Sequence, residues 1–125
     1  MKSSTLVLGA TPNPQRYAYI TTKRLLSSGQ EVELVGIKDG EIGGVPIQQG
    51  QPALDNIDTV TLYVGARHQP LYYDYLLSLK PRRVIFNPGT ENPELVQLLR
   101  EHNIEPVIAC TLVMLASGEY SRHAA

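Results

Sequence analysis

Short runs of apolar and β-branched residues alternate along this chain with longer stretches in which hydrophobic residues recur at helical spacing. Turn-forming glycine, proline and asparagine residues separate the two kinds of segment. The apolar runs predict five strands, at residues 4–9, 31–37, 58–65, 82–89 and 104–110. The amphipathic stretches predict helices at residues 15–28, 71–79 and 94–102, and residues 111–118 predict a last short helix or turn.

Cap residues and prolines indicate where these helices should begin. Asn13 is a suitable N-cap with Pro14 at the first helical position, and Asn92 with Pro93 repeats the arrangement. Pro70 is expected to open the second helix. Each of these helices therefore follows a predicted strand within a few residues.

One segment does not fit the alternation. After the predicted second strand, the turn signal at residues 38–40 leads into residues 41–57, which are rich in glycine, proline and glutamine. We expect a loop here, with room for one extra short strand.

Strands that alternate with helices imply βαβ crossovers and a mainly parallel sheet that is covered on both faces. The pattern predicts an α/β fold: an open, Rossmann-like parallel sheet of five strands with helices on both faces. At 125 residues the chain is the size of one domain, and we expect residues 1–125 to form a single one.

Composition narrows the possible partners. The formal net charge is −1, so there is no basic excess for binding nucleic acid. The first apolar run is too short for a signal sequence or a membrane span. A single cysteine, Cys110, excludes an internal disulfide framework and favours a reducing compartment, so the expected location is the cytoplasm, without a membrane anchor.

Ligands of open parallel sheets bind beyond the carboxyl ends of the strands, so the turn after the first strand is the first candidate site. Gly9 permits a tight turn, Thr11 adds a hydroxyl, and the helix expected to start at Asn13 offers unpaired N–H groups to an anion. Arg16 adds a cation. The alternative is that this glycine and this Asn-Pro pair are turn chemistry alone.

The dinucleotide pattern G-x-G-x-x-G is absent, because Thr11 and Pro14 stand where its later glycines would be. After the second strand, where NAD sites place an acidic residue, this chain has Lys38. A lysine there favours a nucleotide with a phosphorylated ribose, such as coenzyme A (CoA) or NADP. Lys38 is otherwise one more solvated loop lysine.

Four segments, taken in order, resemble a known family, the small stand-alone CoA-binding proteins, whose fold is related to that of the nucleotide-binding domain of succinyl-CoA synthetase. "GATPNPQRY" looks like the Gly-Ala-Ser-x-x-Pro turn of that family, with Thr11 in place of the serine. "GIKDGEIGGVPI", "VIFNPGTENPEL" and "ACTLVML" are similar to its later segments. The likeness spans nearly the whole chain.

The resemblance implies a CoA or acyl-CoA ligand and assigns residues to it. The implied binding residues are Gly9, Ala10, Thr11, Asn13, Pro14, Gln15 and Arg16 at the pyrophosphate, Lys38 at the phosphorylated adenosine, Val64 and Arg67 at the third wall, and Asn87, Pro88 and Gly89, with Thr90, beside the pantetheine. The family often has consecutive arginines after the third strand. This chain departs from that pattern, because only Arg67 is present there.

Candidates for catalysis are few. His68, His102 and His123 are each expected in surface or capping roles, and no metal-ligand spacing is present. The phosphorylated histidine of the synthetase belongs to a domain that this chain lacks, so the resemblance does not extend to ligase activity. Cys110 follows the fifth strand and is either an inert, buried side chain or the partner of the CoA thiol in a mixed disulfide.

The sequence thus favours non-catalytic binding of CoA or an acyl-CoA, without nucleic acid or membrane. Two alternatives remain open at this stage. The same Lys38 permits an NADP-binding oxidoreductase or subunit. The scarcity of arginine after the third strand permits a Rossmann-like protein-interaction module with a vestigial pocket.

Overall fold

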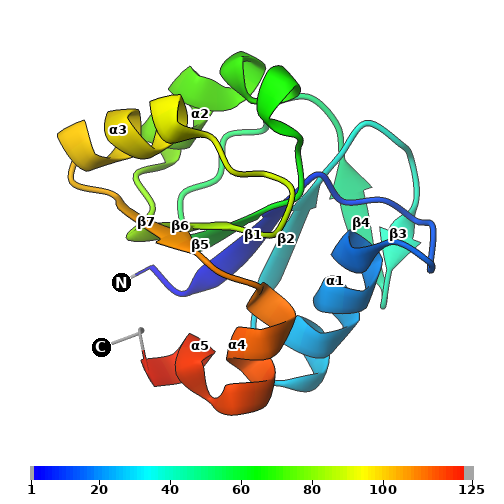
Figure 1. Ribbon diagram of the computed structural model, residues 1–125. Coiled ribbons are helices and arrows are strands. Elements are labelled where there is room, and N and C mark those ends of the chain that lie inside the picture. Colours follow the sequence, from blue (N-terminus) through cyan, green and yellow to red (C-terminus); the bar gives the residue numbers. More distant parts are fainter. Residues whose placement is uncertain (1, 123–125) are drawn as a thin grey trace.

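The computed structural model describes residues 2–122, which form one mixed, mostly parallel sheet with helices on both faces (Figure 1). The strands are β1 (Ser4–Leu8), β2 (Val32–Val35), β3 (Glu41–Ile42), β4 (Val45–Gln48), β5 (Ile57–Leu62), β6 (Arg83–Phe86) and β7 (Glu105–Ile108). They lie in the order β3-β4-β2-β1-β5-β6-β7, and all neighbours are parallel except the β3–β4 pair. The Rossmann-like α/β architecture expected from the sequence is confirmed.

Helices form two layers around this sheet. They are α1 (Tyr17–Ser27), the 3-10 helix η1 (Ala66–Tyr72), α2 (Tyr73–Leu79), α3 (Pro93–Glu101), α4 (Thr111–Ser117) and α5 (Glu119–Arg122). In Figure 1, α2 and α3 lie above the sheet, and α1, α4 and α5 lie below it. Within residues 2–122, every helix is too short or too polar to cross a bilayer.

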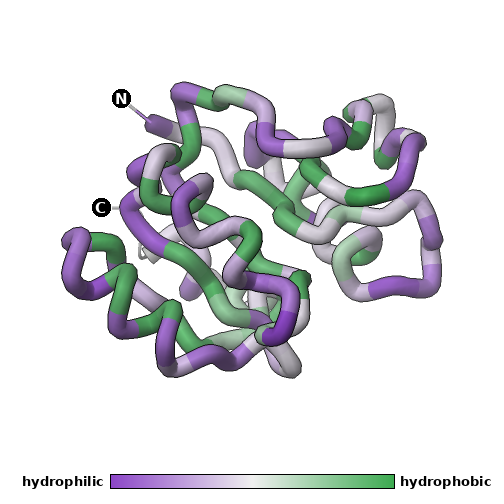
Figure 2. Tube along the Cα trace, turned by 90° about the horizontal axis from the view of Figure 1, so that it is seen from above, coloured by the Kyte–Doolittle hydropathy of each residue, from purple (hydrophilic) through white to green (hydrophobic). Residues whose placement is uncertain are grey.

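The two faces of each strand supply the two halves of the core. In β1, Leu6 and Leu8 belong to the cluster under α2 and α3, whereas Val7 belongs to the cluster above α1 and α4. All three side chains are fully buried. This alternation follows from the period of two in a strand, with both faces covered by helices. Figure 2 shows the result, with hydrophobic segments in the middle and hydrophilic ones along the outer helices and loops.

The expected strand count of five is wrong, because the sheet has seven strands. All five predicted strands exist, but residues 41–57 contribute two more, β3 and β4. Gly43 and Gly44 have φ values of 56° and 85°, which is the conformation of a tight hairpin turn. Ile42 and Ile47 flank this turn and are both buried. The hairpin therefore joins the sheet through its own hydrophobic contacts.

The start of the first helix also differs from expectation. Asn13 does not cap α1; its Oδ1 accepts a hydrogen bond from the N–H of Gln15 at 3.0 Å, and its carbonyl accepts one from Arg16 at 3.1 Å. These bonds close a turn before the helix begins. Arg16 then takes the extended N-cap conformation, and α1 starts at Tyr17. The result is a longer loop after β1.

Two other helix starts give opposite outcomes. Pro70 lies inside η1 and does not open an α-helix: its carbonyl accepts a hydrogen bond from the N–H of Tyr73, three residues on, which is the bond of a 3-10 turn, and α2 begins only at Tyr73. Asn92 caps α3 as expected: its Oδ1 accepts hydrogen bonds from the N–H groups of Glu94 and Leu95, and Pro93 follows at the first helical position.

The strand order reverses beside β1. From β1 the chain moves outward through β2 to the hairpin, then returns to the other side of β1 as β5 and continues to β7. The crossover from β1 to β2 passes through α1 on one face of the sheet, and the crossover from β5 to β6 passes through α2 on the other face, so the segments after β1 and β5 separate there (Figure 1). Open α/β sheets bind ligands at such a switch point, beyond the carboxyl ends of the strands.

Candidate ligand-binding site

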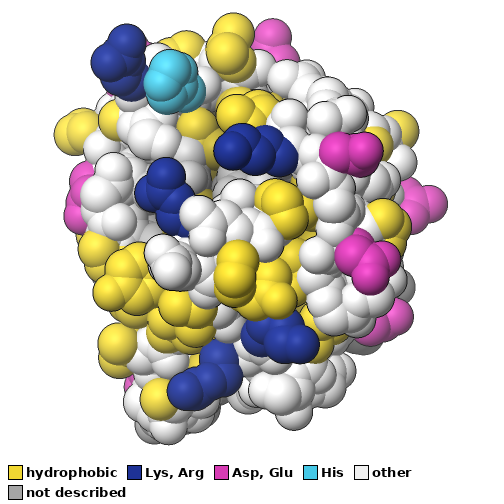
Figure 3. All heavy atoms as spheres, turned by 90° about the vertical axis from the view of Figure 1, so that its right-hand side faces the viewer, with side chains coloured by type: hydrophobic (Ala, Val, Ile, Leu, Met, Phe, Trp, Pro, Cys, Tyr) yellow, Lys and Arg dark blue, Asp and Glu magenta, His cyan; other side chains and the backbone are white. Residues whose placement is uncertain are grey.

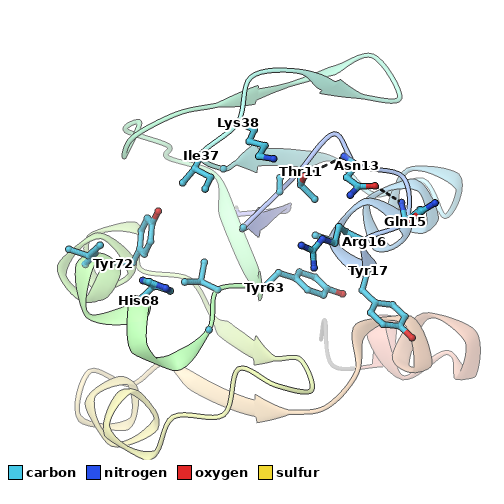
Figure 4. A pocket seen from close by; sticks show the side chains of 17 residues that line it. Thr11, Asn13, Gln15, Arg16, Tyr17, Ile37, Lys38, Tyr63, His68 and Tyr72 are labelled. Atoms are coloured by element: carbon cyan, nitrogen blue, oxygen red, sulfur yellow. Dashed lines mark hydrogen bonds between the residues drawn. The ribbon is translucent and has the colours of Figure 1, made fainter.

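A cleft of about 960 Å³ opens at this switch point, where the segments after β1, β2 and β5 meet. Its volume lies within the range of small-molecule sites. The lining comprises Gly9, Ala10, Thr11, Asn13, Gln15, Arg16, Tyr17 and Ala18 after β1; Gly36, Ile37 and Lys38 after β2; and Tyr63, Val64, Gly65, His68, Leu71 and Tyr72 after β5. Figure 4 shows these three segments facing one another.

The loop after β1 lines the cleft and contains backbone N–H groups without an acceptor. Some of its amides are already used: that of Asn13 is bonded to Thr11 Oγ1, and that of Gln15 to Asn13 Oδ1. Among residues 2–122, the N–H groups of Thr11, Tyr17 and Ala18 have no intramolecular acceptor. The last two are at the N-terminus of α1, where the helix dipole favours an anion.

Two glycines let the strands end close together at the base of the cleft. A Cβ on Gly9 would lie 2.8 Å from the backbone C and O of Tyr63, and the φ of Gly9 is 102°. A Cβ on Gly36 would lie 2.0 Å from the carbonyl oxygen of Ala10. The expected role of Gly9 was to admit a phosphate. The structure gives it a packing role between β1 and β5, because glycine alone fits there without displacement.

The two cationic side chains that line the cleft lie in loops that follow different strands. Arg16 follows β1 and Lys38 follows β2, and both side chains are exposed. Figure 4 shows the Lys38 amine directed toward Thr11, and the Arg16 guanidinium on the other side of that turn. On the face in Figure 3, several Lys and Arg side chains lie among hydrophobic ones, while most of the acidic side chains lie toward the right-hand border. This arrangement favours a ligand that is both anionic and partly apolar.

An apolar wall faces the cationic turn. Ile37 is 82% exposed and Leu71 is 74% exposed, and Val64 and Tyr72 line the cleft beside them. In Figure 4, Ile37, Tyr72 and His68 gather on one side of the cleft, and Thr11, Asn13 and Arg16 on the other. Large apolar side chains left in water around a concavity are typical of a binding site.

Tyr63 lies between these two sides. Its hydroxyl is hydrogen-bonded to Thr21 of α1, and burial raises the pKa of the phenol above its usual value of 10.0. The ring therefore stays neutral at physiological pH and connects the end of β5 to α1.

The structure brings together eight of the residues proposed from the sequence and leaves six outside the cleft lining. Those in the lining are Gly9, Ala10, Thr11, Asn13, Gln15, Arg16, Lys38 and Val64. Those outside it are Pro14, Arg67, Asn87, Pro88, Gly89 and Thr90.

Asn87 lies in the core instead, where its side chain holds two elements together. It is 1% exposed, and its Nδ2 donates hydrogen bonds to Thr61 Oγ1 at 2.8 Å and to the Leu62 carbonyl at 2.9 Å. Its Oδ1 accepts a hydrogen bond from the N–H of Thr111 at 2.9 Å. The side chain thus connects β5 to the start of α4.

Sequence reasoning missed several residues of the cleft. They are Gly36, Ile37, Tyr63, Leu71 and Tyr72, and also His68, which was assigned to the surface. A signal was present for three of them, because Gly36, Ile37 and Tyr63 end the predicted second and third strands, at the same edge of the sheet. Leu71 and Tyr72 reach the cleft only because η1 packs back over that edge.

The remaining candidates lie elsewhere. Cys110 is half-buried at the N-cap of α4, outside the cleft lining. His102 ends α3, where its Nδ1 lies 2.9 Å from the Leu98 carbonyl. His123 is outside the described residues. Within residues 2–122, no group of His, Cys, Asp or Glu side chains is arranged to hold a metal ion.

Comparison with known proteins gives a family and a set of similar folds. A family model described as a CoA binding domain matches residues 3–116. A search of curated proteins found no match.

Solved structures are similar over most of the chain. The crystal structure of an uncharacterized protein has 54% identity and a TM-score of 0.91, covering 94% of this chain and 98% of its own. A hypothetical protein from Pyrococcus horikoshii OT3 has 27% identity and a TM-score of 0.77, with coverage of 87% and 77%. A Thermus thermophilus protein at 22% identity and a TM-score of 0.80, with coverage of 92% and 89%, shares the fold.

Proposed function

The chain belongs to the CoA binding domain family, and on that premise we propose that the cleft beyond β1, β2 and β5 binds CoA or an acyl-CoA without catalysing a reaction. The observation that carries the proposal is the pairing of unused backbone N–H groups with two cations on one side of the cleft and an apolar wall on the other. CoA has the same division, because two phosphate groups and a ribose phosphate accompany an adenine ring and a pantetheine arm.

The diphosphate fits the loop after β1. The N–H groups of Thr11, Tyr17 and Ala18 supply neutral donors, and Arg16 supplies a charged one beside them. Hydrogen bonds from a helix N-terminus and from a guanidinium to phosphate oxygens are mutually reinforcing. In this assignment the loop does not need the second glycine of the dinucleotide pattern. The turn at Asn13 would place the free amides of the loop beside the diphosphate instead.

The phosphorylated adenosine fits the other two segments. Lys38 would contact the ribose phosphate, and the adenine would lie between Ile37 and the wall of Val64 and Tyr72. Burying the exposed Ile37 and Leu71 side chains would add a hydrophobic contribution to binding. The pantetheine arm then leaves along the open side of the cleft.

Calorimetric titration of the protein with CoA, acetyl-CoA and NADP in parallel tests the proposal. We expect CoA and acetyl-CoA to bind with similar affinity and NADP at least about tenfold more weakly, since its nicotinamide half would have to replace the pantetheine arm. Mass spectrometry of small molecules released from freshly purified protein is an independent measurement. Equal or tighter binding of NADP, or the absence of CoA binding, would refute the assignment.

A further inference from the structure

Gln69 is a polar side chain with no exposure to solvent, inside the η1 segment that forms one wall of the cleft. Its Nε2 donates hydrogen bonds to the carbonyl of Val64 at 2.8 Å and to the carbonyl of Thr90 at 2.7 Å. Val64 follows β5, whereas Thr90 follows β6. One amide group therefore ties together the loops after two neighbouring strands.

The other half of the amide is also used. Gln69 Oε1 accepts a hydrogen bond at 2.9 Å from Asn92 Nδ2, which also donates to the Tyr73 hydroxyl. The amide cannot be reversed, because two carbonyl oxygens require two donor hydrogens from Gln69. Asn92 in turn caps α3 through its Oδ1. Both polar atoms of the Gln69 side chain thus have hydrogen-bond partners, in one network that extends from the cleft wall to the N-terminus of α3.

Two further hydrogen bonds are made by this stretch, and neither is a buried contact with another loop. The N–H of His68 donates to the Gly65 carbonyl at 2.9 Å, which is a bond within the segment. Gln51 Nε2 donates to the Leu71 carbonyl at 2.9 Å, but that contact is on the exposed side. Of the two large apolar side chains of η1, Leu71 is exposed and lines the cleft, whereas Tyr72 is half-buried and packs, like Val64, against the core under α2 and α3. Gln69 is the fully buried residue of η1, and it supplies the buried polar attachment of this wall.

We propose that Gln69 is a positioning residue for ligand binding, which fixes the wall formed by Val64, His68 and Tyr72 against the adenosine half of CoA. This inference rests on the proposed function and adds a residue that has no contact with the ligand. Replacing Gln69 would leave the Val64 and Thr90 carbonyls without these donors. A carbonyl that is buried without a hydrogen bond is costly, and this cost would displace the wall. The wall then moves toward water, away from the position that the adenine requires.

The proposed role of Gln69 predicts that replacing it weakens the binding of some fragments of CoA and not of others. Gln69→Met keeps the length and apolar stem of the side chain but removes its donors. We expect it to weaken CoA and adenosine 3′,5′-bisphosphate by the same factor, about tenfold, because both contact the wall through adenosine. Binding of 4′-phosphopantetheine, which lacks adenosine, should be unchanged.

Hydrogen exchange measured without ligand provides a second measurement. Gln69→Met should accelerate exchange of the backbone amides of residues 65–72 by at least about fivefold while leaving those of β1 and β5 unchanged. Tyr120→Phe is the matched control, because it removes a buried hydrogen bond to Thr5, which lies near the amino end of the central strand β1 and away from η1. It should alter neither the affinity for CoA nor exchange in residues 65–72.

A milder variant covers the case in which Gln69→Met does not fold. Asn92→Asp keeps the oxygen that caps α3 but removes the donor to Gln69, and we expect a loss of about threefold in CoA affinity with faster exchange in residues 65–72. Unchanged exchange in both variants, or equal losses for all three ligand fragments, would overturn the role of Gln69. If the wild-type protein binds no CoA, the proposed function fails, and the exchange measurement alone decides whether Gln69 fixes the wall.

Discussion

The carbonyl oxygen of Ala10 occupies the space that a side chain on Gly36 would need. A Cβ at Gly36 would lie 2.0 Å from that oxygen and 3.0 Å from the Ala10 carbonyl carbon. The contact is between two backbone segments, so neither can move aside as a flexible side chain would. The loop after β1 and the end of β2 are therefore brought together at the base of the cleft by the absence of one methyl group.

Gly36→Ala should consequently affect both stability and binding. We expect the free energy of unfolding to fall by about 1–3 kcal/mol, the usual cost of overpacking, and CoA to bind more weakly because Ala10 belongs to the loop that we propose to hold the diphosphate. Urea denaturation and calorimetry measure the two effects. Gly65→Ala is the matched control, since its φ is −62° and the described residues leave open space around its Cβ. A Gly36→Ala protein as stable as this control would contradict the close approach.

Asn87 should be required for stability and not for ligand contact. Replacing it with alanine leaves Thr61 Oγ1, the Leu62 carbonyl and the Thr111 amide without this partner in the core. We expect a loss of about 2–4 kcal/mol in the free energy of unfolding, measured by urea denaturation. The affinity of the folded fraction for CoA should change by less than about twofold. A large loss of affinity at undiminished stability would return the turn at residues 87–89 to the binding site.

The sequence predicted the parts of this molecule that depend on local patterns. All five apolar runs became strands, and the Asn92–Pro93 pair capped α3, because period, caps and turns act over a few residues. Gly43 and Gly44 give a local hairpin signal, but the proline and glutamine around them favour a loop with room for one short strand, so the sequence does not predict the two-stranded β3–β4 hairpin.

The candidate cleft was predictable only where it follows the first two strands. The loop after β1 and Lys38 lie at strand ends whose position in the sheet is fixed by topology. The η1 wall was not predictable, because its approach depends on Gln69 bonding to residues five and 21 positions away. The same limit applies to Asn87, whose type is typical of a turn but whose neighbours come from β5 and α4.

The Asp58–Arg82 ion pair should make the protein less stable in acid. Burial of Asp58 acts to raise its pKa, but hydrogen bonds from Arg82 and Thr59 and the charge of Arg82 outweigh it, so the pKa is lowered from 3.8. The two Arg82 nitrogens lie 3.0 and 3.1 Å from the carboxylate oxygens. A carboxylate with a lowered folded pKa contributes stability above the unfolded value and loses that contribution as pH falls through the folded value.

Asp58→Asn should therefore lower the free energy of unfolding at neutral pH by up to about 1 kcal/mol, because the pair is partly exposed. Below the pKa of the folded state the variant and the wild type should approach each other, since both then lack the charge. Urea midpoints measured at neutral pH and between about pH 4 and pH 2 test this. A difference that stays constant over that range would show that the ion pair does not contribute through ionisation.

The two cations of the cleft should respond differently to the ribose phosphate of CoA. Lys38→Ala is expected to weaken CoA by about tenfold but to leave dephospho-CoA, which lacks that phosphate, nearly unaffected. Arg16→Ala should weaken both ligands by the same factor of about 5–20, because both contain the diphosphate. Arg100→Ala, on the exposed surface of α3, removes a cation outside this cleft and should change neither affinity.

Calorimetry with both ligands on all four proteins separates the two contacts. Raising the salt concentration should reduce the difference between wild type and each cleft variant, since both side chains are exposed and screened by ions. If Lys38→Ala weakened CoA and dephospho-CoA equally, Lys38 would belong with Arg16 at the diphosphate. The adenosine would then have to lie farther from the end of β2, and the apolar wall after β5 would be the main determinant of its position.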